Sequence, residues 1–228
     1  MRDSLAKVAR EVAGCERCER LRTYCLEVAQ ARRRAFREWT YWGKPIAGFG
    51  DENARIWIIG LAPAAHGANR TGRVFTGDRS GDFLFAALHR AGLANQPTSE
   101  RAGDGLALQD VFISAAVRCA PPANKPLPAE AANCSGFLDR EWNLLRRKRV
   151  LFVLGKIAWD ATLALVRRVH GPLKLNRDFG HGAVAALPGG LWLVGSYHVS
   201  QQNTFTGRLT PAMFDRVIRD CQQLVEGA

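Results

Sequence analysis

Four short, continuous apolar runs are the clearest feature of the 228-residue chain. They cover Ile56–Gly60, Val111–Val117, Val150–Leu154 and Leu191–Gly195. A strand with one face in water alternates apolar and polar residues, whereas a continuous apolar run is typical of a parallel strand covered on both faces. The runs therefore predict a four-stranded parallel sheet in an α/β protein.

Helical patterns separate and flank these runs, as expected of β-α-β units. We predict helices over residues 1–12, 19–42, 80–91, 141–147, 157–169 and 211–225. No internal repeat or linker divides the chain, because the proline-rich stretch 121–128 is too short to separate domains. We therefore expect one domain over residues 1–228, with a helical segment at about 1–45.

The net charge of the chain indicates what kind of partner it binds. Lys and Arg exceed Asp and Glu by 11, and the pI is near 10.0, which favours an anionic partner. No apolar run approaches the ~20 residues that span a membrane, and the first residues lack the apolar core of a signal peptide. We expect a cytoplasmic monomer that binds nucleic acid and no membrane.

Four of the six cysteines suggest a shared site. Cys15 and Cys18 form a C-x-x-C pair, and Cys119 and Cys134 follow with fourteen residues between them. Four thiolates suit a structural zinc ion or an iron–sulfur cluster. A zinc ribbon usually has two C-x-x-C pairs, so the wide second pair favours iron–sulfur, although unrelated buried thiols would give the same spacing.

The loops that follow the strands hold the candidate chemistry. Ligands of open parallel sheets bind beyond the carboxyl ends of the strands, and the segment "IIGLAPAAHG" is such a place, with His66 as its only titratable side chain. Phe75 and Asp78 lie in a glycine-rich loop before the 80–91 helix. Helix-start amides can hold an anion, but Ser80 or Asp82 acting as a helix cap explains the same residues.

Two further loops carry polar residues. "SYHVSQQN" places His198 after the last apolar run, and "RCAPPANKPLP" places Asn124 after the second. Each has a structural alternative, since a lone loop histidine is often structural and the prolines can simply position Cys119. A P-loop, a GxGxxG fingerprint and a G-x-S-x-G elbow are all absent from the sequence, which disfavours the usual nucleotide-binding and serine-hydrolase sites.

Together these motifs resemble the iron–sulfur branch of the uracil-DNA glycosylase superfamily. The resemblance rests on CERC, GLAPAAHG, GRVFTGDRSG, RCAPPANKPLP with the later Cys134, and the histidine motif, all in the same order over most of the chain. Better-known members carry an acid where this chain has Leu61, and an asparagine where it has Ala115. Their His-Pro motif reads His198-Val199 here. These departures are similar to the family 5, or type B, enzymes.

The resemblance implies a three-layer α/β/α sandwich around a central four-stranded parallel sheet, and a [4Fe-4S] cluster on Cys15, Cys18, Cys119 and Cys134. It also implies hydrolytic excision of uracil and other deaminated bases, such as hypoxanthine, from DNA, leaving an abasic site. Asp78, His198 and Asn124 would be catalytic, and Phe75, Ala62 and His66 would contact the substrate.

In this scheme Asp78 handles the attacking water, His198 stabilises the departing base, Asn124 helps to bind the base and Phe75 stacks on it. Two other functions remain open on the residues alone. One is a non-catalytic nucleic-acid-binding protein stapled by zinc. The other is a small-molecule α/β enzyme with an incidentally basic surface.

Overall fold

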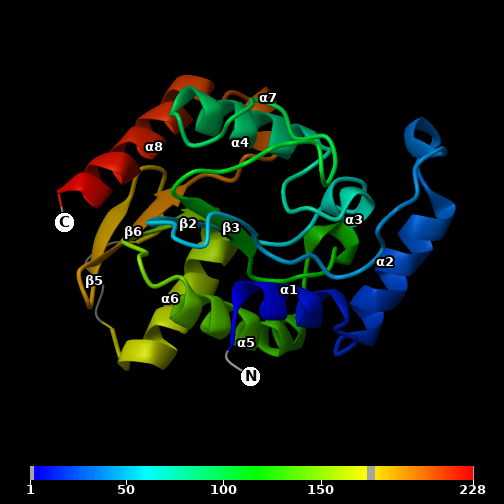
Figure 1. The fold of residues 1–228 in the computed structure, drawn as a ribbon, viewed down its shortest axis with the longest axis horizontal. Helices are drawn as coiled ribbons and strands as arrows, with labels where there is room; N and C mark the ends of the chain where they lie inside the picture. Colours follow the sequence, from blue (N-terminus) through cyan, green and yellow to red (C-terminus); the bar gives the residue numbers. More distant parts are fainter. Residues whose placement is uncertain (1–2, 174–177, 228) are drawn as a thin grey trace.

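A computed structural model of the chain describes residues 3–173 and 178–227. Within them, six strands form one sheet in the order β1-β3-β2-β4-β6-β5, which crosses the middle of the molecule (Figure 1). The strands are β1 (Phe49–Gly50), β2 (Ile56–Gly60), β3 (Val111–Ala115), β4 (Val150–Leu154), β5 (Val184–Leu187) and β6 (Leu191–Ser196).

The predicted parallel core is confirmed. Strands β3, β2, β4 and β6 run parallel, with Ile58 opposite Ile113 and Phe152. The sheet is wider than predicted, because β1 and β5 pair antiparallel with β3 and β6 at its two edges. Strand β1 has only two residues and therefore leaves no apolar run in the sequence. Strand β5 is the short apolar segment VAAL, which the four-strand prediction omits.

Helices cover both faces of the sheet, as an α/β architecture requires. Alternate residues of β2 point to opposite faces of the sheet. Ile58 packs on one face with α4 (Arg79–Arg90) and α8 (Pro211–Glu226). Trp57 packs on the other face with α5 (Pro128–Leu144) and α6 (Lys156–His170). Figure 1 shows α4 and α8 above the sheet and α5 and α6 below it. This two-sided burial explains why the strands are apolar throughout.

The helix predictions are right for 80–91, 157–169 and 211–225 to within about two residues, and α1 (Leu5–Ala13) matches the first one. The prediction over 19–42 is wrong beyond residue 31. Helix α2 (Glu19–Ala31) ends where Arg32 adopts a left-handed φ of 50°, and a short 3₁₀ turn, η1 (Arg34–Phe36), follows. No glycine or proline marks this end in the sequence.

The prediction over 141–147 is also wrong, because α5 begins thirteen residues earlier, at Pro128, and ends at Leu144. Its first half, PAEAANCSG, has few large apolar residues and therefore no helical periodicity to read. The carboxylate of Glu130 accepts a hydrogen bond from the Leu127 backbone at 2.7 Å and starts the helix. Lys148 donates to the carbonyl of Trp142 at 2.6 Å and closes its other end.

The remaining short helices are α3 (Ala68–Thr71), η2 (Pro122–Asn124) and α7 (Gln201–Phe205). They follow β2, β3 and β6, so all three stand beyond the carboxyl ends of parallel strands. In the parts of the chain that the structure describes, no helix has the length and apolar character needed to cross a membrane.

Candidate active site

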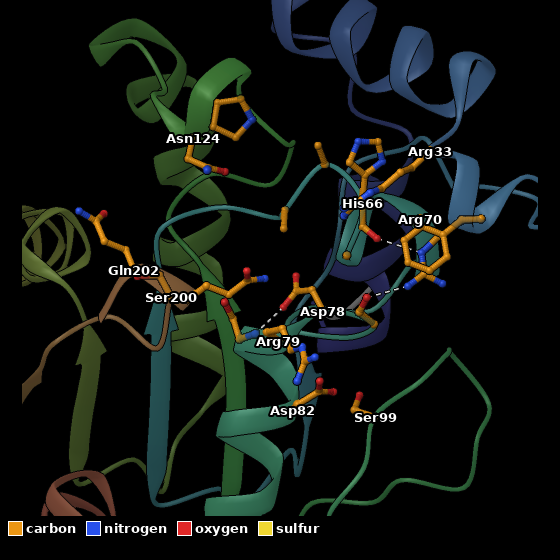
Figure 2. A pocket seen from close by; sticks show the side chains of 18 of the residues that line it. Arg33, His66, Arg70, Asp78, Arg79, Asp82, Ser99, Asn124, Ser200 and Gln202 are labelled. Atoms are coloured by element: carbon orange, nitrogen blue, oxygen red, sulfur yellow. Dashed lines mark hydrogen bonds between the residues drawn. The ribbon is translucent and has the colours of Figure 1, made fainter. Parts of the chain in front are cut away.

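A cleft of about 1020 Å³ opens at the carboxyl edge of the sheet. The loops after β2, β3 and β6 contribute to its wall, as does the start of α4. Figure 2 shows side chains from these separate segments facing the same space. Three residues predicted from the sequence line this cleft, namely His66, Asp78 and Asn124.

Asp78 both starts helix α4 and faces the cleft. Its Oδ1 accepts hydrogen bonds from the backbone N–H groups of Ser80, at 2.9 Å, and Gly81, at 3.1 Å. Asp78 is therefore the helix cap, a role for which the sequence had suggested Ser80 or Asp82. Among the described residues none donates a hydrogen bond to Oδ2, so one carboxylate oxygen is available to a ligand or water.

Burial raises the pKa of Asp78 above its usual range, and the negative charge of Asp82 adds to this, while the two cap N–H groups and Arg70 oppose it. A raised pKa is the common property of carboxylates that accept protons in enzymes.

Two glycines make room for this carboxylate. A Cβ on Gly67 would overlap Oδ2 of Asp78, and a Cβ on Gly81 would overlap the carbonyl oxygen of Phe75. The loop of residues 66–67 therefore approaches the helix start more closely than any other residue type allows.

Arg70 joins the loops on both sides of Asp78. Its guanidinium donates to the carbonyl of His66 at 2.9 Å and to that of Gly77 at 2.6 Å. The same group lies over the rings of Phe36, at 3.9 Å, and Trp39, at 4.1 Å. Its exposed fraction is only 4%, so Arg70 holds the wall of the cleft rather than reaching into solvent.

His66 is the titratable residue of the loop after β2. Its Nδ1 pairs with the Tyr41 hydroxyl at 3.2 Å. Partial burial, together with the positive charges of Arg33 and Arg70, lowers the pKa of the imidazole. His66 is therefore neutral at pH 7 and faces the cleft as a hydrogen-bonding group.

Phe75 and His198 lie together beside the cleft but are not part of its lining. Their ring centroids are 6.2 Å apart and the planes are tilted by 33°. The Phe75 ring packs against the backbone of Gly60, at the end of β2, where a Cβ would meet it at 2.7 Å. Burial lowers the pKa of His198, which keeps the imidazole neutral.

Asn124 and Ala62 have different surroundings. Asn124 sits in a left-handed turn, with φ 56°, and its exposed side chain lies on the cleft wall opposite the Arg70 side (Figure 2). Ala62 does not line the cleft. It packs instead against the apolar group that contains Cys119 and Cys134.

Several lining residues carry no signal in the sequence. Ser99 and Glu100 come from the loop before β3, far from any motif, and Asp82 resembles an ordinary exposed helix residue. Ser99 is held there by the buried Arg73, which donates to its hydroxyl at 2.8 Å and forms an ion pair with Asp104. No local pattern in the sequence predicts that Arg73 pairs with Asp104, which lies 31 residues further along the chain.

The four predicted cysteines gather near one another. Cys119 and Cys134 are buried in one apolar group, against which Cys18 packs. Cys15 packs on the neighbouring group formed by α1 and Phe137. The amide of Asn133 donates to Cys18 at 3.4 Å. Burial raises the pKa of Cys134, and the thiols of Cys18 and Cys15 raise it further.

All six cysteines are free thiols. Cys25 lies in the same apolar group as Cys119, and Cys221 lies apart in α8. Among the described residues, no group of three or more His, Cys, Asp or Glu side chains has the arrangement of a site for a metal ion.

The comparisons with known proteins identify relatives for most of the chain. The family model "Uracil DNA glycosylase superfamily" matches residues 47–222. The type-5 uracil-DNA glycosylase of Mycobacterium leprae is 51% identical over 97% of this chain and 96% of its own. That of Thermus thermophilus is 50% identical over 93% and 94%. A type-4 uracil-DNA glycosylase of Archaeoglobus fulgidus is 27% identical over 74% and 72%.

Identity of about half, over nearly the full length of both chains, leaves no large segment of this protein outside the match. The expected family is therefore confirmed: this chain belongs to the uracil-DNA glycosylase superfamily and, within it, to the type-5 family.

Proposed function

We propose that the protein is a DNA repair enzyme that removes uracil, and other deaminated bases such as hypoxanthine, by hydrolysis of the N-glycosidic bond. The observation that carries this proposal is Asp78, whose buried carboxylate turns one unbonded oxygen toward the cleft. Because the chain belongs to the uracil-DNA glycosylase superfamily, we assign this carboxylate a role in hydrolysis of the N-glycosidic bond.

The substrate base must leave the duplex before it can be cleaved, which costs a few kcal/mol in lost stacking and pairing. The excess of 11 positive charges favours DNA binding and offsets this cost. The cleft, at about 1020 Å³, has room for a nucleotide with its sugar and phosphates.

Bond cleavage places positive charge on the sugar and negative charge on the departing base. Asp78 stabilises the sugar cation and orients the attacking water through Oδ2, because Oδ1 is already bound to the α4 amides. The raised pKa of this carboxyl suits proton uptake from that water.

His198 acts on the other product. Its burial keeps the imidazole neutral, so that it donates a hydrogen bond to the base oxygen on which negative charge develops. Phe75, 6.2 Å away between ring centroids, supplies a stacking surface for the base. Asn124 and His66 add hydrogen bonds from the two sides of the cleft.

The range of bases that the enzyme accepts depends on Ala115. This buried residue ends β3 beside Gly60. The better-known iron–sulfur uracil glycosylases, which are more specific for uracil, carry an asparagine at this position. A methyl group makes no hydrogen bond to the base. Discrimination then rests on shape and stacking, which tolerate several deaminated bases.

Cys15, Cys18, Cys119 and Cys134 would hold a [4Fe-4S] cluster. The donor set fits, because four free thiols come from three segments, three of them in or against one apolar group and Cys15 against the neighbouring group. Four cysteine thiolates are the usual ligands of such a cluster. These cysteines would then join the amino-terminal turn to the loop after β3, which carries Asn124.

Release of free base from defined duplexes tests the function. Duplexes that contain uracil, hypoxanthine or no lesion are incubated with the protein, and the released base and any strand breaks are measured. We expect base release from the two lesion duplexes, and abasic strands that stay intact until alkali is added. The reason is that no lysine is found among the described residues that line the cleft, so none is placed to form a Schiff base. Binding without base release would overturn the proposal and favour a non-catalytic nucleic-acid-binding protein.

A further inference from the structure

An exposed, strongly basic segment borders the cleft on its α2 side. Residues 32–39, which we name the basic arm, carry four arginines and one glutamate, Glu38. All four arginine side chains are exposed, namely Arg32, Arg33, Arg34 and Arg37. In Figure 1 the arm projects from the end of α2 away from the sheet. Among the elements that line the cleft it is the one with the densest positive charge.

The arm is held in place by contacts with the wall of the cleft. Phe36 and Trp39 turn inward onto the guanidinium of Arg70, at 3.9 and 4.1 Å. The backbone of Trp42 donates to the Arg70 carbonyl at 3.0 Å, directly after the arm. Its aromatic residues therefore anchor it. Arg32 donates to the backbone carbonyl of Arg37 within the arm at 2.7 Å, and all four arginine side chains remain exposed to a partner.

These contacts connect the arm to Asp78. Arg70 also donates to the carbonyl of Gly77, the residue before Asp78, at 2.6 Å. Arg33, Phe36 and Trp39 line the same cleft as Asp78. A partner bound along the arm is therefore positioned directly beside the proposed reaction site.

A second basic cluster provides a contrast. Arg146, Arg147 and Arg149 are equally exposed, but they stand in the turn before β4. That turn lies at the amino edge of the sheet, whereas the cleft lies at the carboxyl edge. The two clusters have similar charge and differ in their position relative to the site.

We propose that the basic arm binds the phosphate backbone of the DNA strand beside the extruded nucleotide. The inference rests on the proposed function and adds the surface by which the substrate is held. Arginine is well suited to this, because its planar group donates two hydrogen bonds to one phosphate. The other side of the cleft, formed by α7, offers Gln201 and Gln202, which are uncharged.

Two matched triple variants test the proposal. R32Q/R34Q/R37Q removes three charges from the arm and leaves Arg33, which lines the cleft, in place. R146Q/R147Q/R149Q removes three charges at the opposite edge. Affinity for an undamaged duplex and for a uracil duplex is measured by fluorescence anisotropy at several salt concentrations, and KM for uracil release is measured beside it.

We expect the arm variant to bind more weakly, to have a raised KM, and to show a salt slope smaller by about 0.9 for each phosphate that the arm no longer neutralises. The control variant is expected to keep the wild-type slope. Equally weakened binding in both variants, or unchanged binding in the arm variant, would overturn the arm proposal. A wild-type protein that binds neither duplex would instead overturn the proposed function, so the two failures are distinguishable.

Discussion

The two edges of the sheet use similar polar residues in opposite ways. At the amino edge, Asp110 accepts from the backbone and the side chain of Arg55 at 2.9 to 3.0 Å. Its own backbone N–H donates to Asp51 at 3.0 Å. At the carboxyl edge, Asp78 uses a single oxygen for α4, and Oδ1 of Asn69 is buried without a hydrogen-bond partner among the described residues.

The difference separates carboxylates used entirely in turns from one that keeps an oxygen available. The amino-edge carboxylates are fully engaged in closing turns, so they add stability and have nothing left to offer a ligand. At the carboxyl edge, Asp78 lines the cleft and keeps one oxygen without a hydrogen-bond donor among the described residues, whereas Asn69 is buried outside the lining. Buried polar groups cost free energy unless they are paired, and sites that bind substrates are where proteins retain such groups.

The largest expected effect comes from Asp78→Asn. Asparagine keeps an oxygen that accepts the two N–H groups of α4, so the helix start is preserved. It carries no negative charge and takes up no proton. We expect base release to fall by about 10²- to 10⁴-fold, with little change in the thermal unfolding temperature or in DNA affinity.

Asp110→Asn is the matched control at the other edge. It removes one partner of the ion pair with Arg55, and we expect it to lower the free energy of unfolding by about 1 kcal/mol while base release stays at the wild-type rate. Normal base release by Asp78→Asn would contradict the proposed catalytic role of Asp78 and, with it, a functional difference between the two edges.

Cys119→Ser is expected to have the next largest effect. Cys119 is 6% exposed and central to the apolar group of the cysteines. We expect the variant to lose most of its bound iron and the brown visible absorption of the purified protein. Iron and zinc content and the absorption spectrum are the measurements.

Cys221→Ser is the comparison variant, because Cys221 is equally buried but lies in α8, apart from the other cysteines. It should retain the iron content of the wild type. A colourless wild-type protein that contains zinc, or equal iron loss from both variants, would contradict the assignment of the four ligands.

The smallest effect concerns Asp82. Burial and the charge of Asp82 both raise the pKa of Asp78. In the proposed reaction Asp78 works as a carboxylate, so activity should fall as the pH drops through that raised pKa. Asp82→Asn removes a negative neighbour and lowers the pKa of Asp78. The acid limb of the kcat profile should then move to lower pH, by less than about one unit.

Asp139→Asn, on the exposed face of α5, is the control variant. We expect the acid limb of its kcat profile to stay at the wild-type pH. A limb that moves to higher pH in Asp82→Asn, or that moves equally in both variants, would show that Asp82 does not act on Asp78.

The sequence predicts the centre of this fold well and its periphery poorly. Strands such as Ile56–Gly60 are buried on both sides, so their composition alone identifies them. The two-residue edge strand β1 depends on hydrogen bonds to β3, and this dependence leaves no local pattern. Strand β5 is the apolar segment VAAL, joined to β6 by Pro188-Gly189-Gly190, so the prediction misses a hairpin that the sequence does indicate. After α2 ends at Arg32, the chain packs through Phe36 and Trp39 on Arg70, which lies 38 positions beyond Arg32 and so leaves no local pattern at this end.

The candidate site shows the same division. His66, Asp78 and Asn124 could be predicted because each follows a recognisable strand or glycine-rich loop, and all three line the cleft. Arg70 and Arg73 could not, because a loop arginine normally predicts an exposed side chain, whereas these two are 4% and 5% exposed. The roles of all six candidate site residues stay predictions, and three of them, Phe75, His198 and Ala62, lie outside the lining of the cleft.

The glycines at positions 67 and 81 give a way to sort related sequences. Any side chain at either position would collide with Asp78 or with the backbone that carries it. A relative that has an aspartate at position 78 but a larger residue at 67 or 81 must place its carboxylate elsewhere. Comparing these three positions together therefore separates relatives that retain this geometry from those that share only the fold.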